Sequence, residues 1–161
     1  IYNLNTQGLN VGFYREVLKP AGFLGNIKST SAQLYVMALI YASQMAWDDI
    51  LIFNERGNIV EGSSSNLFMV KGETVCTPAL DQGCVDGVMR KVVLDLLKTL
   101  PYKVLECEIT AEDLLGADEV FLTNAIAGIS WIKGIEHKRY YHKVASRLME
   151  VLQEAVFPGI V

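Results

Sequence analysis

Strand-like and helix-like segments alternate along the whole chain, and this alternation constrains the fold more than any other feature. Short apolar or alternating runs bounded by turn residues predict strands at residues 9–17, 50–53, 59–61, 66–70, 73–76, 102–108, 118–123 and 129–132. Apolar residues at helical spacing predict helices over residues 29–47, from about 87 to 100, and 142–156. Thr110 with Asp113 is typical of a helix N-terminus. Interspersed strands and helices indicate an α/β domain with a mixed sheet that curls around a site.

Composition excludes several classes of partner. The 161 residues are enough for one domain with its own core, and 51% of them are hydrophobic. The net charge is −4 and the basic residues are scattered, so we expect no nucleic-acid or anionic membrane partner. No apolar run approaches the roughly 20 residues that span a bilayer. The chain begins with Ile1 rather than Met, so we expect that the start of the natural chain is missing or was processed.

The three cysteines are Cys76, Cys84 and Cys107. Their number is odd and their spacing matches no metal-binding pattern, so we expect no metal site. A reducing, cytoplasmic setting is the simplest interpretation, with each thiol acting as a small hydrophobic side chain in a core.

Lys28 is the first candidate for chemistry. It lies between a loop that contains Gly22 and Gly25 and a strongly apolar helical segment. An amine near apolar surface loses some stabilisation of its charged form, which frees it to attack a carbonyl. The alternative is an ordinary solvated lysine at the start of a helix.

Glu61 follows a strand and precedes a run of small polar residues at 62–66. A carboxylate in that position can sit in a pocket and hold a protonated ring nitrogen, or it can be a turn residue in water. The serine run lacks the G-x-S-x-G pattern, which argues against a serine hydrolase.

Two further segments offer groups for an anion. Gly87, Val88 and Met89 open a helix, where free backbone N–H groups and the helix dipole favour a phosphate. Asn124 and Ala125 end a later strand beside open backbone donors. In chain order, an amine, a carboxylate and two sets of anion donors are what pyridoxal phosphate requires of a protein.

Four segments resemble the fold-type IV, or class IV, pyridoxal-phosphate enzymes, which include branched-chain aminotransferases, D-amino acid transaminases and 4-amino-4-deoxychorismate lyases. These segments are residues 27–30, 58–68, 77–78 with 85–90, and 117–125, in the order and spacing of the family. The resemblance implies the large cofactor-binding domain of the D-amino acid aminotransferase-like fold, in which the curled sheet forms a pseudo-barrel surrounded by helices.

The resemblance also implies roles for single residues. Lys28 would form the Schiff base with pyridoxal phosphate and then move the substrate proton, and Glu61 would pair with the pyridine nitrogen. Val85 would pack on the ring face, and the backbone amides of the helix start would meet the phosphate. The implied cofactor-binding set is Lys28, Glu61, Val85, Gly87, Val88, Met89, Asn124 and Ala125.

Some positions depart from the family pattern. Ser31 stands where many members have Asn, and Met89 and Ala125 stand where transaminases often have Thr. The motifs leave two reactions open, transamination of a small amino acid and elimination by a 4-amino-4-deoxychorismate lyase. A non-catalytic pyridoxal-phosphate-binding homologue and a plain structural domain are further alternatives.

The resemblance covers only one of the family's two domains. We therefore expect residues 1–161 to be the C-terminal, cofactor-binding domain, without the small N-terminal domain. In the family that domain supplies an arginine to the cofactor phosphate and much of the substrate pocket. By analogy with the family we expect a homodimer.

Overall fold

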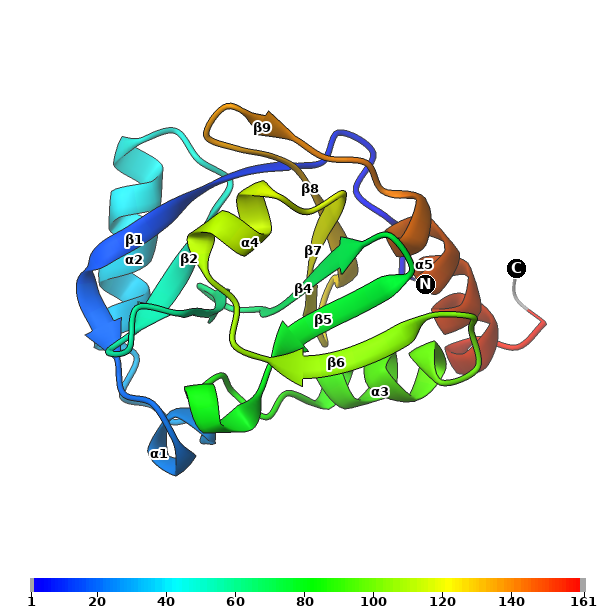
Figure 1. Cartoon of the computed structure of the whole chain (residues 1–161), viewed down its shortest axis with the longest axis horizontal. Helices are drawn as coiled ribbons and strands as arrows, with labels where there is room; N and C mark the ends of the chain where they lie inside the picture. Colours follow the sequence, from blue (N-terminus) through cyan, green and yellow to red (C-terminus); the bar gives the residue numbers. More distant parts are fainter. Residues whose placement is uncertain (1, 160–161) are drawn as a thin grey trace.

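The computed structural model describes residues 2–159 and shows an α/β fold built on one curled sheet (Figure 1). Ile1, at which the chain begins, and residues 160–161 lie outside the described part. The strands are β1 Leu9–Lys19, β2 Asp49–Asn54, β3 Ile59–Gly62, β4 Asn66–Lys71, β5 Thr74–Pro78, β6 Lys103–Cys107, β7 Glu119–Asn124, β8 Gly128–Ile135 and β9 Lys138–Arg139. The helices are α1 Phe23–Asn26, α2 Gln33–Gln44, α3 Val88–Leu97, α4 Ala111–Leu115 and α5 Lys143–Val156, with a short 3-10 helix, η1, at Leu80–Gln82.

Six strands close into a barrel. They follow one another in the order β3-β2-β1-β8-β7-β4, and β3 also pairs with β4, which joins the two ends of this path. Glu61 opposite Asn66 is the closing pair. β1 runs parallel to β2 and β8, and the other pairings in the ring are antiparallel. The predicted mixed, curled sheet is confirmed, and its seam lies at Glu61.

β2 is buried along its whole length because its two faces pack against different cores. Leu51 belongs to the cluster that contains Leu114 of α4, whereas Ile50 and Ile52 pack in a second cluster with Ala38 of α2. Successive side chains of a strand point to opposite faces, so a strand buried on both sides has no polar alternation. A third cluster joins β4 and β7 to α3 and α5, which cover another outer face of the barrel (Figure 1).

The helix that carries the second cluster is shorter than predicted. α2 begins at Gln33, not near Ser29, and ends at Gln44. Ser29 Oγ accepts a hydrogen bond from the Ser31 N–H at 3.1 Å, and such local side-chain bonds compete with helical ones. At the other end the chain turns back through Ala46, whose φ is 55°.

The structure adds three elements that the sequence pattern did not predict. α1 and η1 lie in segments predicted to be loops, and β9 pairs with β8. Thr110 and Asp113 form a complete capping box at the start of α4, as predicted. No helix within residues 2–159 is both long and apolar enough to cross a membrane.

The N-terminus of α5 is capped by a residue far away in the sequence. Glu119 of β7 is buried, and its carboxylate accepts hydrogen bonds from the backbone N–H groups of Val144 at 2.9 Å and Ala145 at 3.3 Å. A carboxylate there satisfies free donors and complements the helix dipole.

We expect Glu119→Ala to lower the free energy of unfolding by about 2 kcal/mol, since it removes a cap and leaves buried N–H groups without acceptors. Urea unfolding followed by far-UV circular dichroism measures this loss. Glu154→Ala, on the exposed side of the same helix, is the control and should change the value by less than about 0.5 kcal/mol. An equal effect of the two substitutions would contradict the capping role.

Candidate functional site

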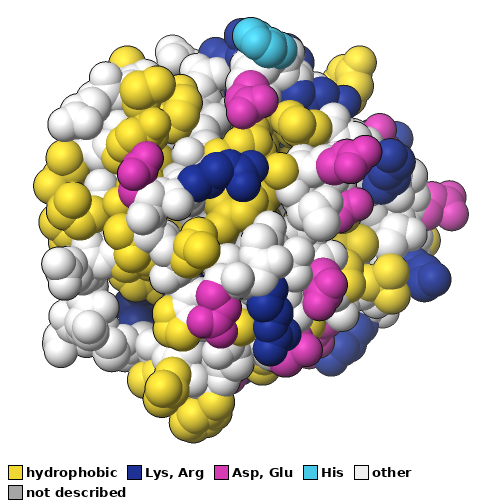
Figure 2. Space-filling model, turned by 60° about the vertical axis from the view of Figure 1, so that its left-hand side comes forward, with side chains coloured by type: hydrophobic (Ala, Val, Ile, Leu, Met, Phe, Trp, Pro, Cys, Tyr) yellow, Lys and Arg dark blue, Asp and Glu magenta, His cyan; other side chains and the backbone are white. Residues whose placement is uncertain are grey.

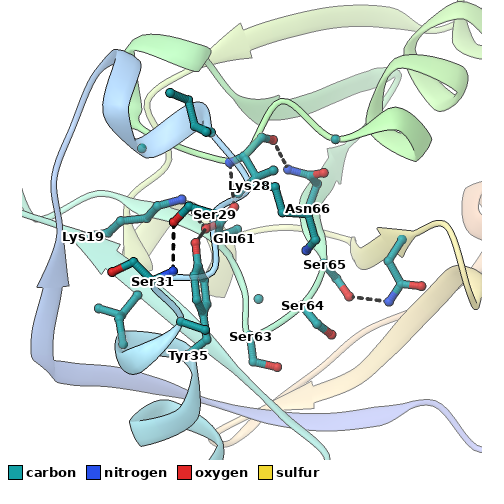
Figure 3. A pocket seen from close by; sticks show the side chains of 18 of the residues that line it. Lys19, Lys28, Ser29, Ser31, Tyr35, Glu61, Ser63, Ser64, Ser65 and Asn66 are labelled. Atoms are coloured by element: carbon teal, nitrogen blue, oxygen red, sulfur yellow. Dashed lines mark hydrogen bonds and ion pairs between the residues drawn. The ribbon is translucent and has the colours of Figure 1, made fainter.

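A pocket of about 840 Å³ opens where the barrel seam meets α2 and the start of α3 (Figure 3). All eight residues predicted to bind a cofactor line this pocket, although they come from four separate segments of the chain. They are Lys28, Glu61, Val85, Gly87, Val88, Met89, Asn124 and Ala125.

The side chain of Glu61 accepts three hydrogen bonds, and both of its carboxylate oxygens are used. Its side chain is 3% exposed, on the strand that closes the barrel. One carboxylate oxygen accepts from Lys19 Nζ at 2.5 Å and from the Tyr35 hydroxyl at 2.7 Å. The other accepts from the backbone N–H of Val85 at 2.7 Å. Burial of a charge is costly without such partners, so the site is built to hold a carboxylate here.

Lys19 and Tyr35 are site residues that the sequence interpretation missed. Lys19 is the last residue of β1 and is 6% exposed, and in Figure 3 it and Tyr35 reach toward Glu61. Burial raises the pKa of the Tyr35 hydroxyl far above its usual range, and the charge of Glu61 and the hydrogen bond to it add to this rise. Tyr35 therefore stays protonated and donates. The only sequence signal was a lysine followed by Pro20 at a strand end.

Lys28 lies in the segment between α1 and α2 and lines the same pocket as Glu61. Its side chain is exposed, so the apolar shielding expected from the neighbouring sequence is not what the structure shows. Figure 3 shows Lys28 and Asn66 on the opposite side of Glu61 from Lys19. Two lysines of very different burial thus line one pocket.

The N-terminus of α3 faces this pocket. Its N-cap residue, Gly87, has an extended backbone. No side chain caps this ten-residue helix, so its first N–H groups have no side-chain acceptor. Asn66 holds the preceding loop, since its side-chain amide donates to the Val85 carbonyl at 2.7 Å. Open donors at a helix start that lines a pocket are suited to an anionic group.

Gly87→Ala should disturb this arrangement, because an added Cβ would lie 2.1 Å from Asn66 Oδ1. Asn66 is buried and could move only by giving up its bond to Val85, so we expect a loss of about 1–3 kcal/mol in stability. Thermal unfolding measures the loss. The double substitution Gly87→Ala/Asn66→Ala removes the obstructing oxygen and should cost less than the sum of the two single changes. Strict additivity would contradict this account.

The end of β7 supplies the last wall of the pocket. Asn124 uses its side chain within the protein, because its amide donates to Ser65 Oγ at 2.9 Å and its oxygen accepts from the Ile126 and Ala127 N–H groups. Thr123, one residue earlier, has a buried Oγ1 without a hydrogen-bond partner in residues 2–159. A buried hydroxyl in a pocket wall with no protein partner fits a site that receives a polar ligand.

The apolar surface around α1 and α2 is extensive. Figure 2, turned so that this side comes forward, shows hydrophobic side chains exposed over much of it. They include Phe23 and Leu24 in α1 and Leu39 and Ile40 in α2. α2 therefore buries one side against β1 and β2 and leaves apolar side chains open on the other.

Comparison with known proteins identifies the family. The family model described as amino-transferase class IV matches residues 3–135. The chain belongs to the class IV aminotransferase family. Class IV aminotransferases are pyridoxal-phosphate enzymes, so the resemblance noted in the sequence is confirmed.

Relatives within class IV carry two kinds of name. A branched-chain-amino-acid aminotransferase of Arabidopsis thaliana is 32% identical over 96% of this chain and 42% of its own length. An aminodeoxychorismate lyase of Vibrio harveyi is 33% identical over 80% of this chain and 48% of its own length. The crystal structure of a branched-chain aminotransferase from Thermoproteus uzoniensis with norvaline has a TM-score of 0.86 and 26% identity, and the match covers 95% of this chain and 52% of that one. The chain thus spans about half the length of these relatives.

Proposed function

We propose that the protein containing this chain is a pyridoxal-phosphate-dependent enzyme that acts on a small amino compound. One observation carries the proposal. The pocket brings together an amine, a buried carboxylate and an open helix N-terminus, from Lys28, Glu61 and α3, which lie far apart in the sequence. Family membership supports the same chemistry.

The residues of the pocket fit this cofactor. Lys28 would hold it covalently, Glu61 would face the ring nitrogen, and the amides of Val88 and Met89 would hold the phosphate. The buried Thr123 hydroxyl is a further polar group at this wall. When bound, the cofactor supplies an electron-accepting ring that stabilises negative charge on the substrate carbon.

Residues of this chain would move the substrate proton and orient the carboxylate that meets the ring. The Lys28 amine, once displaced by an amino substrate, would take the proton from the substrate carbon and return it. Lys19, Tyr35 and the Val85 N–H keep the Glu61 carboxylate in one orientation, so that it meets the ring without reorganising.

The substrate and the reaction branch define two versions of the proposal. A transaminase passes the amino group to a keto acid, whereas an aminodeoxychorismate lyase eliminates pyruvate. A product assay on the complete protein with aminodeoxychorismate and a panel of D- and L-amino acids separates them. Pyruvate release without a keto-acid acceptor supports the lyase, and strict dependence on the acceptor supports the transaminase. Bound cofactor without turnover of any amino donor would favour the non-catalytic homologue.

We also propose that this chain is the C-terminal domain of a homodimeric, cytoplasmic protein. The matched relatives are about twice as long as the region they share with this chain, which supports the domain assignment. The family resemblance supports the dimer, and the three free cysteines support a reducing compartment. Sedimentation of the complete protein tests the assembly, and a monomer at micromolar concentration would contradict it.

A further inference from the structure

The segment before Lys28 is fastened to the loop before α3. The side-chain amide of Asn26 donates two hydrogen bonds, to the carbonyl oxygens of Leu80 at 2.6 Å and Cys84 at 2.7 Å. The Asn26 carbonyl in turn accepts from the backbone N–H of Asp86 at 3.0 Å. Asn26 thus uses both amide hydrogens and its backbone oxygen on one partner loop.

Two glycines let the segments approach closely enough for these bonds. A Cβ at Gly25 would lie 2.5 Å from the carbonyl oxygen of Gly83, and Gly83 itself has a φ of +90°. A fourth hydrogen bond between the two segments lies nearby, where the Gly22 N–H donates to the Asp81 carbonyl at 2.9 Å. A side chain at either Gly25 or Gly83 would force the two loops apart. Glycine at these positions therefore allows the hydrogen bonds of Asn26 to form.

The fastened loop leads directly to the cofactor pocket. Cys84, whose carbonyl accepts from Asn26, precedes Val85, whose N–H donates to Glu61. Lys28 follows Asn26 by two residues. The proposed covalent lysine and the proposed ring-binding carboxylate are therefore connected by two hydrogen bonds, from Asn26 to Cys84 and from Val85 to Glu61, and by short stretches of backbone.

We propose that Asn26 is a positioning residue that holds the Lys28 segment at the correct place relative to Glu61. Val85 has its own bonds to Glu61 and Asn66, so loss of the Asn26 side chain would free the lysine segment and leave the ring side of the pocket in place. Covalent attachment needs the amine within reach of the cofactor aldehyde, whereas noncovalent binding does not. Substitution of Asn26 should therefore weaken covalent attachment of the cofactor much more than its noncovalent binding.

The test compares two cofactor forms in the complete protein. Pyridoxal phosphate has an aldehyde that can react with lysine, and pyridoxamine 5'-phosphate does not. We expect Asn26→Ala to weaken binding of pyridoxal phosphate about tenfold, which is the scale of two lost hydrogen bonds. Binding of pyridoxamine 5'-phosphate should change by less than about twofold. The Asn26→Asp variant keeps the size of the side chain but has no amide donor for the Leu80 and Cys84 carbonyls, so it should weaken binding of pyridoxal phosphate at least as much as Asn26→Ala.

Asn5→Ala is the matched control. Asn5 also bonds a distant backbone segment through its side-chain amide and oxygen, at Trp131, but it does not line the pocket. Asn5→Ala should lower the melting temperature, but it should change the affinities for pyridoxal phosphate and pyridoxamine 5'-phosphate by the same factor. Equal weakening of both forms by the Asn26 variants, or no weakening, would overturn the positioning role. Because this inference rests on the proposed function, an unaltered protein that forms no covalent bond at Lys28 would instead refute that function.

Discussion

Lys19→Met is expected to lower the free energy of unfolding by about 3–5 kcal/mol, because it removes one partner of a buried ion pair. Lys19 and Glu61 are 6% and 3% exposed and their charged atoms are 2.5 Å apart. Methionine fills a similar volume, so the loss would come from the carboxylate left without its cation, not from a cavity. Tyr35 and Val85 would still donate to Glu61, but they carry no charge.

A double-mutant cycle on thermal or urea unfolding of the cofactor-free protein measures this coupling. Lys19→Met/Glu61→Gln removes both charges and should recover much of the stability lost in Lys19→Met alone. Lys98→Met, in an ion pair with Asp95 that is 72% exposed on both sides, is the matched control and should change stability by less than about 1 kcal/mol. Additive effects of the two pocket substitutions would contradict a coupled buried pair.

Lys28→Ala is expected to abolish covalent attachment of pyridoxal phosphate and to lower turnover by at least about 10³-fold, since no other group would carry the substrate proton. Lys28 is exposed and lies outside the helices and strands, so the fold should survive the change. Absorbance of the bound cofactor and a coupled amino-donor assay measure the two losses. Lys143→Ala, an exposed lysine at the start of α5, should leave both unchanged.

If pyridoxal phosphate still attached covalently to the Lys28→Ala variant, another amine would form the Schiff base. Lys19 is the alternative that the pocket itself offers. Its buried pair with Glu61 argues against this, because the Lys19 amine would have to leave the carboxylate that it contacts at 2.5 Å before it could attack an aldehyde.

Local patterns predicted most of the secondary structure, and the family motifs predicted eight residues that line the pocket. The buried apolar run of β2 predicted a strand, and Thr110 with Asp113 predicted the start of α4. Closure of the sheet into a barrel depends on pairings between strands far apart in the chain, β1 with β8 and β4 with β7, which no local pattern encodes. The start of α2 was misplaced because Ser29 and Ser31 bond locally in a segment whose apolar neighbours favour a helix.

The residues predicted from family motifs line the pocket, and those that act through contacts distant in the sequence were not predicted. Lys19 and Glu61 are 42 residues apart and meet because β1 and β3 flank β2. Asn26 meets Leu80 and Cys84, which lie 54 and 58 residues further along the chain. The sequence around a single asparagine or lysine does not show whether its side chain makes such a contact or is exposed to solvent. The structure was therefore needed to place Asn26 and Lys19.

Reduction of the cofactor-loaded complete protein with borohydride, followed by peptide mapping, tests the central claim most directly. We predict that the pyridoxyl label is on the peptide containing Lys28 and that the peptide containing Lys19 is unmodified. A label on Lys19, or no label in protein that holds pyridoxal phosphate, would contradict the assignment of Lys28.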